Sequence, residues 1–142
     1  MMALVFAALG CERDHEALEI QCLNAVFGGC NNVTAWPTEE NNTVIITQTI
    51  DTLDVFISFN YNGGGPFSTD CIVHDDSIIM TIQDTCTILP CASRSYCDYL
   101  FNFYFAYKGS SDEPCYWKLI LYQAISDQNI LIKEGSVDIC GE

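Results

Sequence analysis

The sequence predicts an all-β fold, an antiparallel β-sandwich of about seven short strands that is stapled by disulfides. Three observations lead to this prediction. Apolar and polar residues alternate with a period of two in several segments, as in strands with one buried face. Clusters of Gly, Pro, Asn and Asp separate those segments and indicate turns. Nine cysteines in 142 residues exceed cytosolic usage and indicate an oxidising compartment.

The clearest alternation in the first half of the chain lies in residues 53–60. The residues on its apolar face are Leu53, Val55, Ile57 and Phe59. Residues 43–50 are rich in β-branched side chains, which favours a second strand, joined to the first by a tight connection at Asp51-Thr52. Residues 61–66, Tyr-Asn-Gly-Gly-Gly-Pro, then interrupt regular structure.

The strongest strand pattern lies in residues 99–107. Its apolar face consists of Phe101, Phe103, Phe105 and Tyr107. Residues 78–82 alternate before it, and residues 116–122 and 129–138 alternate after a break at residues 109–114. Short strands separated by turn residues in this way are typical of a sandwich, immunoglobulin-like or similar.

The segment of residues 16–26 fits either a short helix or an irregular strand. Leu18, Cys22 and Ala25 would share one face of a helix. Leu18, Ile20 and Cys22 would equally share one face of a strand, so both interpretations stay open. Residues 27–32, Phe-Gly-Gly-Cys-Asn-Asn, have the composition of a turn. Only this N-terminal part of the fold is expected to hold a helix.

The charge balance excludes several partners. Nineteen acidic residues against five basic ones give a net charge of −14, and the basic residues are scattered along the chain. Phosphate backbones require clusters of Lys and Arg, so nucleic acid is excluded. Adsorption to anionic lipid through protein charge is disfavoured for the same reason. No apolar run reaches the roughly 18 residues that a transmembrane helix needs.

An apolar run at the N-terminus ends in Ala8-Leu9-Gly10-Cys11. These residues resemble the lipobox of bacterial lipoprotein signal peptides, in which the cysteine thiol carries the lipid. The resemblance implies a signal segment in residues 1–10, a lipidated Cys11 and a tether in residues 11–16. The acidic residues just after Cys11 are also similar to the surface-export signals of Bacteroidetes lipoproteins. The alternative is a buried strand in residues 4–9, with Cys11 as a core or disulfide cysteine.

Eight cysteines remain once Cys11 is assigned to a lipid, and they suffice for four disulfides. They are Cys22, Cys30, Cys71, Cys86, Cys91, Cys97, Cys115 and Cys140. The absence of a C-x-x-C spacing argues against a zinc ribbon or a thioredoxin-like centre. Spacing does not determine the pairing, because eight cysteines allow about 105 connectivities. We expect local pairs, namely Cys22–Cys30, Cys71–Cys86, Cys91–Cys97 and Cys115–Cys140.

No catalytic residue is predicted. His74 is the one credible histidine, and no G-x-S-x-G motif accompanies it. Together with Asp70, Asp75 and Asp76 it offers a cation site or an acid/base pair, although we favour a charged loop between two strands. The three aspartates are weak candidates for calcium ligands, since their order does not match that of an EF-hand. We therefore predict no metal and no cofactor.

Several aromatic residues lie away from the predicted inward faces. They are Trp36, Tyr61, Tyr96, Tyr104, Tyr116 and Tyr122. They offer a surface for a sugar or a peptide. We favour the simpler interpretation, in which strand tyrosines pack sideways and keep their hydroxyls in water.

The predicted protein is an exported cell-envelope lipoprotein with one β-sandwich domain in residues 17–142. Its expected role is non-catalytic binding or structural interaction at the outer membrane, in the periplasm or at the cell surface. The expected partners are the membrane, through the lipid anchor only, and a protein or glycan ligand. Two alternatives stay open. One is a small secreted hydrolase that uses acidic residues and His74. The other is a subunit of a surface filament whose apolar N-terminal segment pairs as a strand.

Overall fold

A computed structural model of the chain describes residues 17–34, 36–37, 42–63, 65–74 and 77–139. Its strands are β1 (Glu19–Thr34), β2 (Thr43–Gln48), β3 (Thr52–Gly63), β4 (Phe67–His74), β5 (Ser77–Asp84), β6 (Ala92–Lys108), β7 (Cys115–Gln123) and β8 (Gln128–Val137). The described residues contain no helix, and therefore none that is long and apolar enough to cross a membrane. The segment that the sequence left open between helix and strand thus runs into β1.

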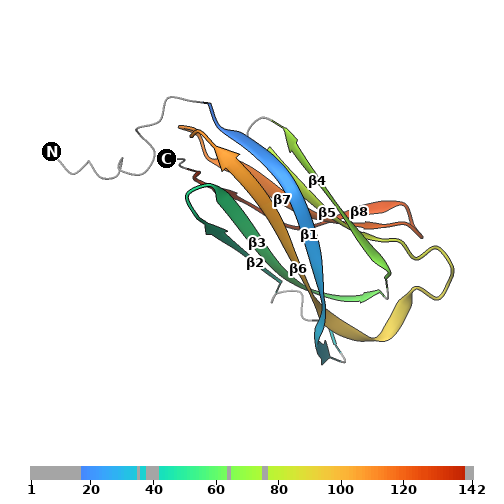
Figure 1. The fold of residues 1–142 in the computed structure, drawn as a ribbon. Coiled ribbons are helices and arrows are strands. Elements are labelled where there is room, and N and C mark those ends of the chain that lie inside the picture. The colour runs from blue at the N-terminus through green and yellow to red at the C-terminus, as the bar shows by residue number, and fades with distance from the viewer. Residues whose placement is uncertain (1–16, 35, 38–41, 64, 75–76, 140–142) are drawn as a thin grey trace.

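The eight strands form two four-stranded sheets that face each other (Figure 1). The strand order is β1-β6-β3-β2 in one sheet and β4-β5-β7-β8 in the other. The prediction of an all-β fold is confirmed. The expectation of wholly antiparallel sheets is wrong, because β5 pairs with β7 in parallel. The intervening strand β6 belongs to the other sheet, so the chain returns to its starting end before β7 begins.

The core fills the space between the sheets with the apolar faces that the alternation predicts. Its central members are Leu53, Val55, Ile57, Phe59, Ile78, Met80, Ile82, Phe101, Phe103, Phe105, Leu119 and Leu121. None of these side chains is more than 3% exposed. Burying a side chain of this size stabilises a fold by about 1.5–3 kcal/mol. The four strands that contribute these residues, β3, β5, β6 and β7, therefore supply most of the hydrophobic stabilisation.

The strand β4 raises the number of strands above the predicted seven. Its residues alternate between half-buried and exposed along its whole length. The inward set includes Thr69 and Cys71 besides Phe67 and Val73, so the apolar alternation is weak in the sequence. Pairing with β5 over eight residue pairs nevertheless makes the segment a strand.

The predicted turn in residues 27–32 is wrong, because β1 continues through it to Thr34. The pairing of β1 with β6 shifts in register between Phe27 and Gly29, and Gly29 has a φ of 90°. A positive φ costs glycine little, so here the residue allows a β-bulge rather than a chain reversal. A Cβ on Gly28 would lie 3.1 Å from the Cβ of Leu100, so the two strands pack closely there.

Three disulfides lie among the described residues. Cys22–Cys71 joins β1 to β4, which are edge strands of different sheets. Cys30–Cys97 joins β1 to β6, and Cys86–Cys91 closes the loop between β5 and β6. The disulfide with the longest sequence separation, 67, therefore lies within one sheet.

The predicted pairs Cys22–Cys30, Cys71–Cys86 and Cys91–Cys97 are wrong. Cys22 and Cys30 lie on the same extended strand, where a rise of about 3.3 Å per residue keeps them far beyond disulfide distance. The fourth predicted pair stays a prediction. Cys115 is buried at the start of β7, and Cys140 lies outside the described residues.

The sequence separations predict how much each disulfide stabilises the fold. Cys22–Cys71 spans 49 residues and Cys86–Cys91 spans 5. Loop-closure entropy gives about 4 kcal/mol for the long loop and about 2 kcal/mol for the short one. We expect the Cys22→Ser/Cys71→Ser variant to lose about twice as much free energy of unfolding in urea as the Cys86→Ser/Cys91→Ser variant. Equal losses would contradict this prediction.

Candidate functional site

A hydrogen-bonded polar cluster connects the two sheets at the end of β3. The Tyr61 hydroxyl donates to Oδ2 of Asp84 at 2.6 Å, and Nε2 of Gln123 donates to the same hydroxyl at 3.0 Å. Asp84 is only 3% exposed, and its Oδ1 accepts from the Cys86 amide at 3.1 Å. A buried carboxylate needs such partners. We call the side chains of Tyr61 in β3, Asp84 in β5 and Gln123 in β7 the polar lock, because their hydrogen bonds join the two sheets.

The polar lock changes the acidity of the phenol. The pKa of Tyr61 is raised to about 12, first by burial and then by the hydrogen bond to Asp84, whose effect is larger than the lowering by the Gln123 bond. Tyr99 lies close by and donates to the carbonyl of Gly63 at 3.0 Å. Its pKa is also raised, first by burial and then by the charge of Asp84. Both hydroxyls therefore stay protonated donors at physiological pH.

Glycine is required at position 63 by close approach. A Cβ there would collide with the ring of Tyr61 and with Oδ2 of Asp84. The residue is buried, and its carbonyl already accepts from Tyr99. The first glycine of the break that the sequence shows after residue 62 therefore allows close packing around the polar lock.

Beside the polar lock, a groove of about 480 Å³ opens between the end of β3 and β8. Among the described residues, four side-chain amides and two tyrosines line it together with apolar residues. The described lining residues are Asn42, Phe59, Asn60, Tyr61, Asn62, Tyr96, Leu121, Gln123, Ile130, Leu131 and Ile132. We call it the amide groove. Its volume falls in the range of about 300–1,000 Å³ that is usual for small-molecule sites.

Irregularities in two strand pairings bring residues into the amide groove. Tyr61 lies opposite Cys97, but Gly63 lies opposite Ala92, so the ladder skips Asn62 of β3 and residues 93–96 of β6, which include Tyr96. In the second sheet the pairing of β7 with β8 shifts at Ile132. β-Bulges re-aim side chains and are common beside functional sites. Here the bulge residues of both sheets line the same groove.

Hydrogen bonds hold the Asn42 and Asn60 side chains of the groove in place. Asn60 is 6% exposed and donates from Nδ2 to Oδ1 of Asp98 at 2.8 Å. Its backbone amide donates to Oδ1 of Asn42 at 2.9 Å. Lys133 of β8 donates from Nζ to the Asn42 carbonyl at 3.1 Å and so connects the edges of the two sheets. The groove is thus largely formed before any ligand arrives.

A second exposed feature is the loop closed by Cys86–Cys91, called the apolar loop. Ile88 and Leu89 at its tip are 81% and 74% exposed. Residues 85–93 carry no charge in a chain with a net charge of −14. Thr85 fixes the base of the loop, since its amide and hydroxyl donate to the Pro66 carbonyl at 2.9 and 2.8 Å. Exposed neighbouring aliphatic side chains of this kind commonly mark contact sites.

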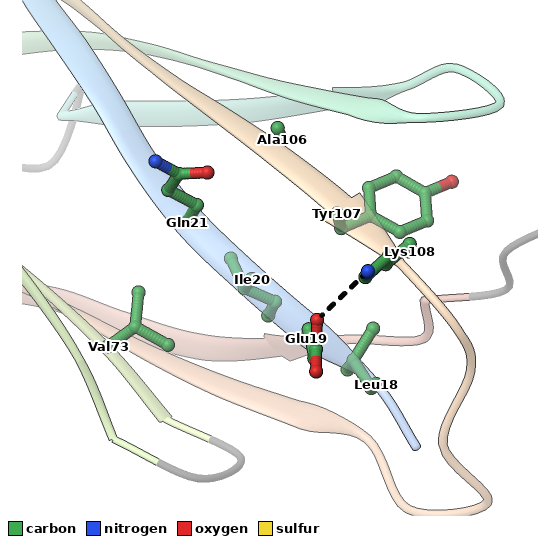
Figure 2. A pocket seen from close by; sticks show the side chains of 8 residues that line it. All are labelled: Leu18, Glu19, Ile20, Gln21, Val73, Ala106, Tyr107 and Lys108. Atoms are coloured by element: carbon green, nitrogen blue, oxygen red, sulfur yellow. Dashed lines mark ion pairs between the residues drawn. The ribbon is translucent and has the colours of Figure 1, made fainter. Parts of the chain in front are cut away.

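A wider groove of about 680 Å³ lies at the opposite end of the sheets, near the start of β1. Figure 2 shows Leu18 to Gln21 along β1, Val73 of β4 on one side and the end of β6 on the other. The one ion pair drawn there joins Lys108 Nζ to Glu19 Oε1 at 3.5 Å. Both side chains are largely exposed, so the pair adds little stability.

Only part of the acidic cluster that the sequence suggested lies among the described residues. Asp70 and His74 lie on β4 with exposed side chains, whereas Asp75 and Asp76 lie outside the described residues. Among the residues that the structure describes, no three His, Cys, Asp or Glu side chains form a group that could hold a metal ion. Residues 1–16, with the predicted lipidation site Cys11, also lie outside the described part.

Of the six aromatic residues singled out in the sequence, Tyr61 and Tyr96 meet in the amide groove. Trp36 is 76% exposed, and Tyr116 is 51% exposed on the outer face of β7. Tyr122 donates to Oδ1 of Asp127 at 2.7 Å near the hairpin between β7 and β8. The groove amides and Asp84 gave no signal in the sequence, except that Asn60 to Asn62 stand where alternation gives way to glycines.

Comparisons with models of known protein families, with curated proteins and with solved structures find no match for this chain.

The polar lock predicts a change of stability with alkaline pH. The pKa of Tyr61 is raised from 10.0 to about 12 in the folded protein, so folding favours the neutral hydroxyl. This contribution is complete below pH 10 and is lost as the pH rises towards 12. Because the Tyr61 ring is partly exposed, solvent screening reduces this contribution to about 1 kcal/mol. We expect the free energy of unfolding in urea to fall less between pH 10 and 12 for Tyr61→Phe than for the wild type.

The same substitution has an effect at neutral pH. It removes a hydrogen bond from the buried Asp84 carboxylate, so we expect the free energy of unfolding to fall by about 1–3 kcal/mol at pH 7. The pKa of Tyr99 is raised by burial and by Asp84, and the pKa of Tyr122 is raised by its hydrogen bond to Asp127. The substitution leaves Asp84 and Asp127 in place, so the difference between the two proteins reports on Tyr61. Parallel pH profiles would show that the Tyr61 hydroxyl does not contribute.

Proposed function

We propose that this chain is an exported, non-catalytic interaction domain of the cell envelope, anchored through a lipid on Cys11. The observation that carries the proposal is the apolar loop. It combines an oxidised cysteine pair, which reducing compartments disfavour, with two aliphatic side chains that only a partner would bury. The lipobox-like residues before Cys11 support the anchor.

The position of the apolar loop supports contact with a partner away from the anchor. In Figure 1, β1 begins at one end of the sheets, and the connection from β5 to β6 lies at the other. A chain tethered by residues that precede β1 would hold Ile88 and Leu89 away from its own membrane. A convex apolar tip fits a hydrophobic pocket on a protein partner, and burying it would contribute at about 25 cal/mol per Å².

We also propose that the two sheets form an immunoglobulin-like sandwich. The order β1-β6-β3-β2 places strands side by side that are distant in sequence, as Greek-key connections do. The parallel pairing of β5 with β7 distinguishes this chain from the all-antiparallel arrangement. An experimental structure that showed these sheets closed into a barrel would overturn this assignment.

The location is tested by intact mass spectrometry of the protein purified from its native cells, before and after reduction. We expect an N-terminus at Cys11 with the added mass of a lipid, and a gain of two hydrogens for each reduced disulfide. A Cys11→Ser variant would keep the disulfides but lose the lipid and the membrane association. An unprocessed N-terminus with all thiols reduced would remove the proposal.

The contact role of the apolar loop is tested by placing a photo-crosslinking residue at position 88 in the expressing cells. A matched control carries it at position 116, which is exposed on the outer face of β7. We expect a defined protein adduct from position 88 that Leu89→Ser reduces at least several-fold. Identical adducts from both positions, or none from position 88, would contradict the contact role.

A further inference from the structure

We propose that the amide groove binds an uncharged carbohydrate. The inference deepens the proposed recognition role and rests on it, because it names a ligand class for a second surface at the end of the sheets that carries the apolar loop. Its parts are the side-chain amides of Asn42, Asn62 and Gln123, the rings of Tyr61 and Tyr96, and an aliphatic floor.

The charge of the groove favours a neutral ligand. None of its described lining residues is charged, although 17% of the chain is Asp, Glu, Lys or Arg. The two described carboxylates that contact lining residues already accept hydrogen bonds, since Asp84 accepts from Tyr61 and Asp98 accepts from Asn60. The Nζ of Lys133 donates to the backbone of Asn42. A charged ligand would therefore find no opposite charge among these residues to offset its desolvation.

The polar groups of the groove match hydroxyls. A carbohydrate hydroxyl both donates and accepts, and a side-chain amide offers one acceptor and two donors. The side chains of Asn62 and Tyr96 have no hydrogen-bond partner among the described residues, although both line the groove. Tyrosine rings present a negative face to the C–H side of a sugar ring. Polar and apolar contacts are thus offered side by side, as a pyranose requires.

The fixed framework favours binding further. The Tyr61 hydroxyl is held by Asp84 and Gln123, and Asn60 is held by Asp98 and Asn42. Preformed sites lose less conformational entropy when a ligand binds. The three bulge residues Asn62, Tyr96 and Ile132 come from both sheets, so the groove exists only in the complete fold.

An extended peptide is the competing occupant, and the observations disfavour it. A peptide that adds to a sheet binds through main-chain hydrogen bonds to an open strand. At the end of β3 the backbone amide of Asn60 is already bonded to Oδ1 of Asn42 at 2.9 Å. The groove instead offers side-chain groups from several strands, which suits separate hydroxyls better than a continuous main chain.

The test uses the full-length, oxidised protein and three sets of probes. They are neutral hexasaccharides of glucose, N-acetylglucosamine and mannose, sulfated and sialylated oligosaccharides, and an uncharged extended peptide. We expect titration calorimetry to detect at least one neutral oligosaccharide and neither of the other sets. Tyr96→Ala and Asn62→Leu should each weaken that binding about tenfold or more, a change that corresponds to about 1.4 kcal/mol.

Matched controls separate the groove from the rest of the surface. Tyr116→Ala and Asn24→Leu alter exposed residues on β7 and β1 outside the groove, so we expect unchanged affinity from both. Urea unfolding of each variant shows whether it folds. If Asn62→Leu does not fold, Asn62→Asp serves as the second groove substitution. Absence of binding to every neutral sugar, equal effects in groove and control variants, or a preference for acidic sugars or peptide would overturn the proposal.

Failure of the carbohydrate proposal can be distinguished from failure of the proposed envelope function. An oxidised, lipidated protein that binds no neutral sugar would keep the envelope role and remove only the carbohydrate site. Reduced cysteines and an unmodified N-terminus in the native cell would remove the envelope role. The titration of the oxidised protein would still decide the carbohydrate site.

Discussion

Close packing between the two sheets is the constraint on which the other features depend. Phe59, Phe101, Phe103 and Phe105 are at most 1% exposed, and they meet the aliphatic faces of β5 and β7. Interiors packed this densely tolerate neither voids nor extra atoms. The central strands are therefore committed to stability, and recognition has to take place at strand ends, loops and irregular pairings. Both the amide groove and the apolar loop lie at such places.

The polar lock marks the boundary between this core and the surface that carries the proposed functions. Asp84 ends β5 inside the protein and accepts from the Tyr61 hydroxyl of β3, which in turn accepts from Gln123 of β7. The same Asp84 holds the Cys86 amide at the base of the apolar loop. One buried carboxylate thus fixes a wall of the amide groove and the start of the apolar loop, so that both surfaces depend on a single satisfied charge.

Much of the fold could be predicted because alternation is strong where one face is fully apolar. The segments around Leu53, Ile78, Phe101 and Leu119 all place their predicted faces in the core. Prediction failed where inward positions were mixed, as in β4, and where glycines allowed a bulge rather than a turn, as in β1. For the site, the sequence indicated Tyr61 and Tyr96 only as two of six aromatic residues away from the inward faces, since nothing in their spacing indicates that register shifts bring them together.

The sequence by itself determined the all-β class, the inward faces of the central strands, the acidic charge and the capacity for disulfides. These are local or summed properties, set by each segment's own residues. Only the tertiary structure decided that Cys22 pairs with Cys71, that β5 and β7 run parallel and that an uncharged groove forms beside Asp84. Such features depend on which distant strands become neighbours. That choice follows from the packing of the whole core, which no single segment encodes.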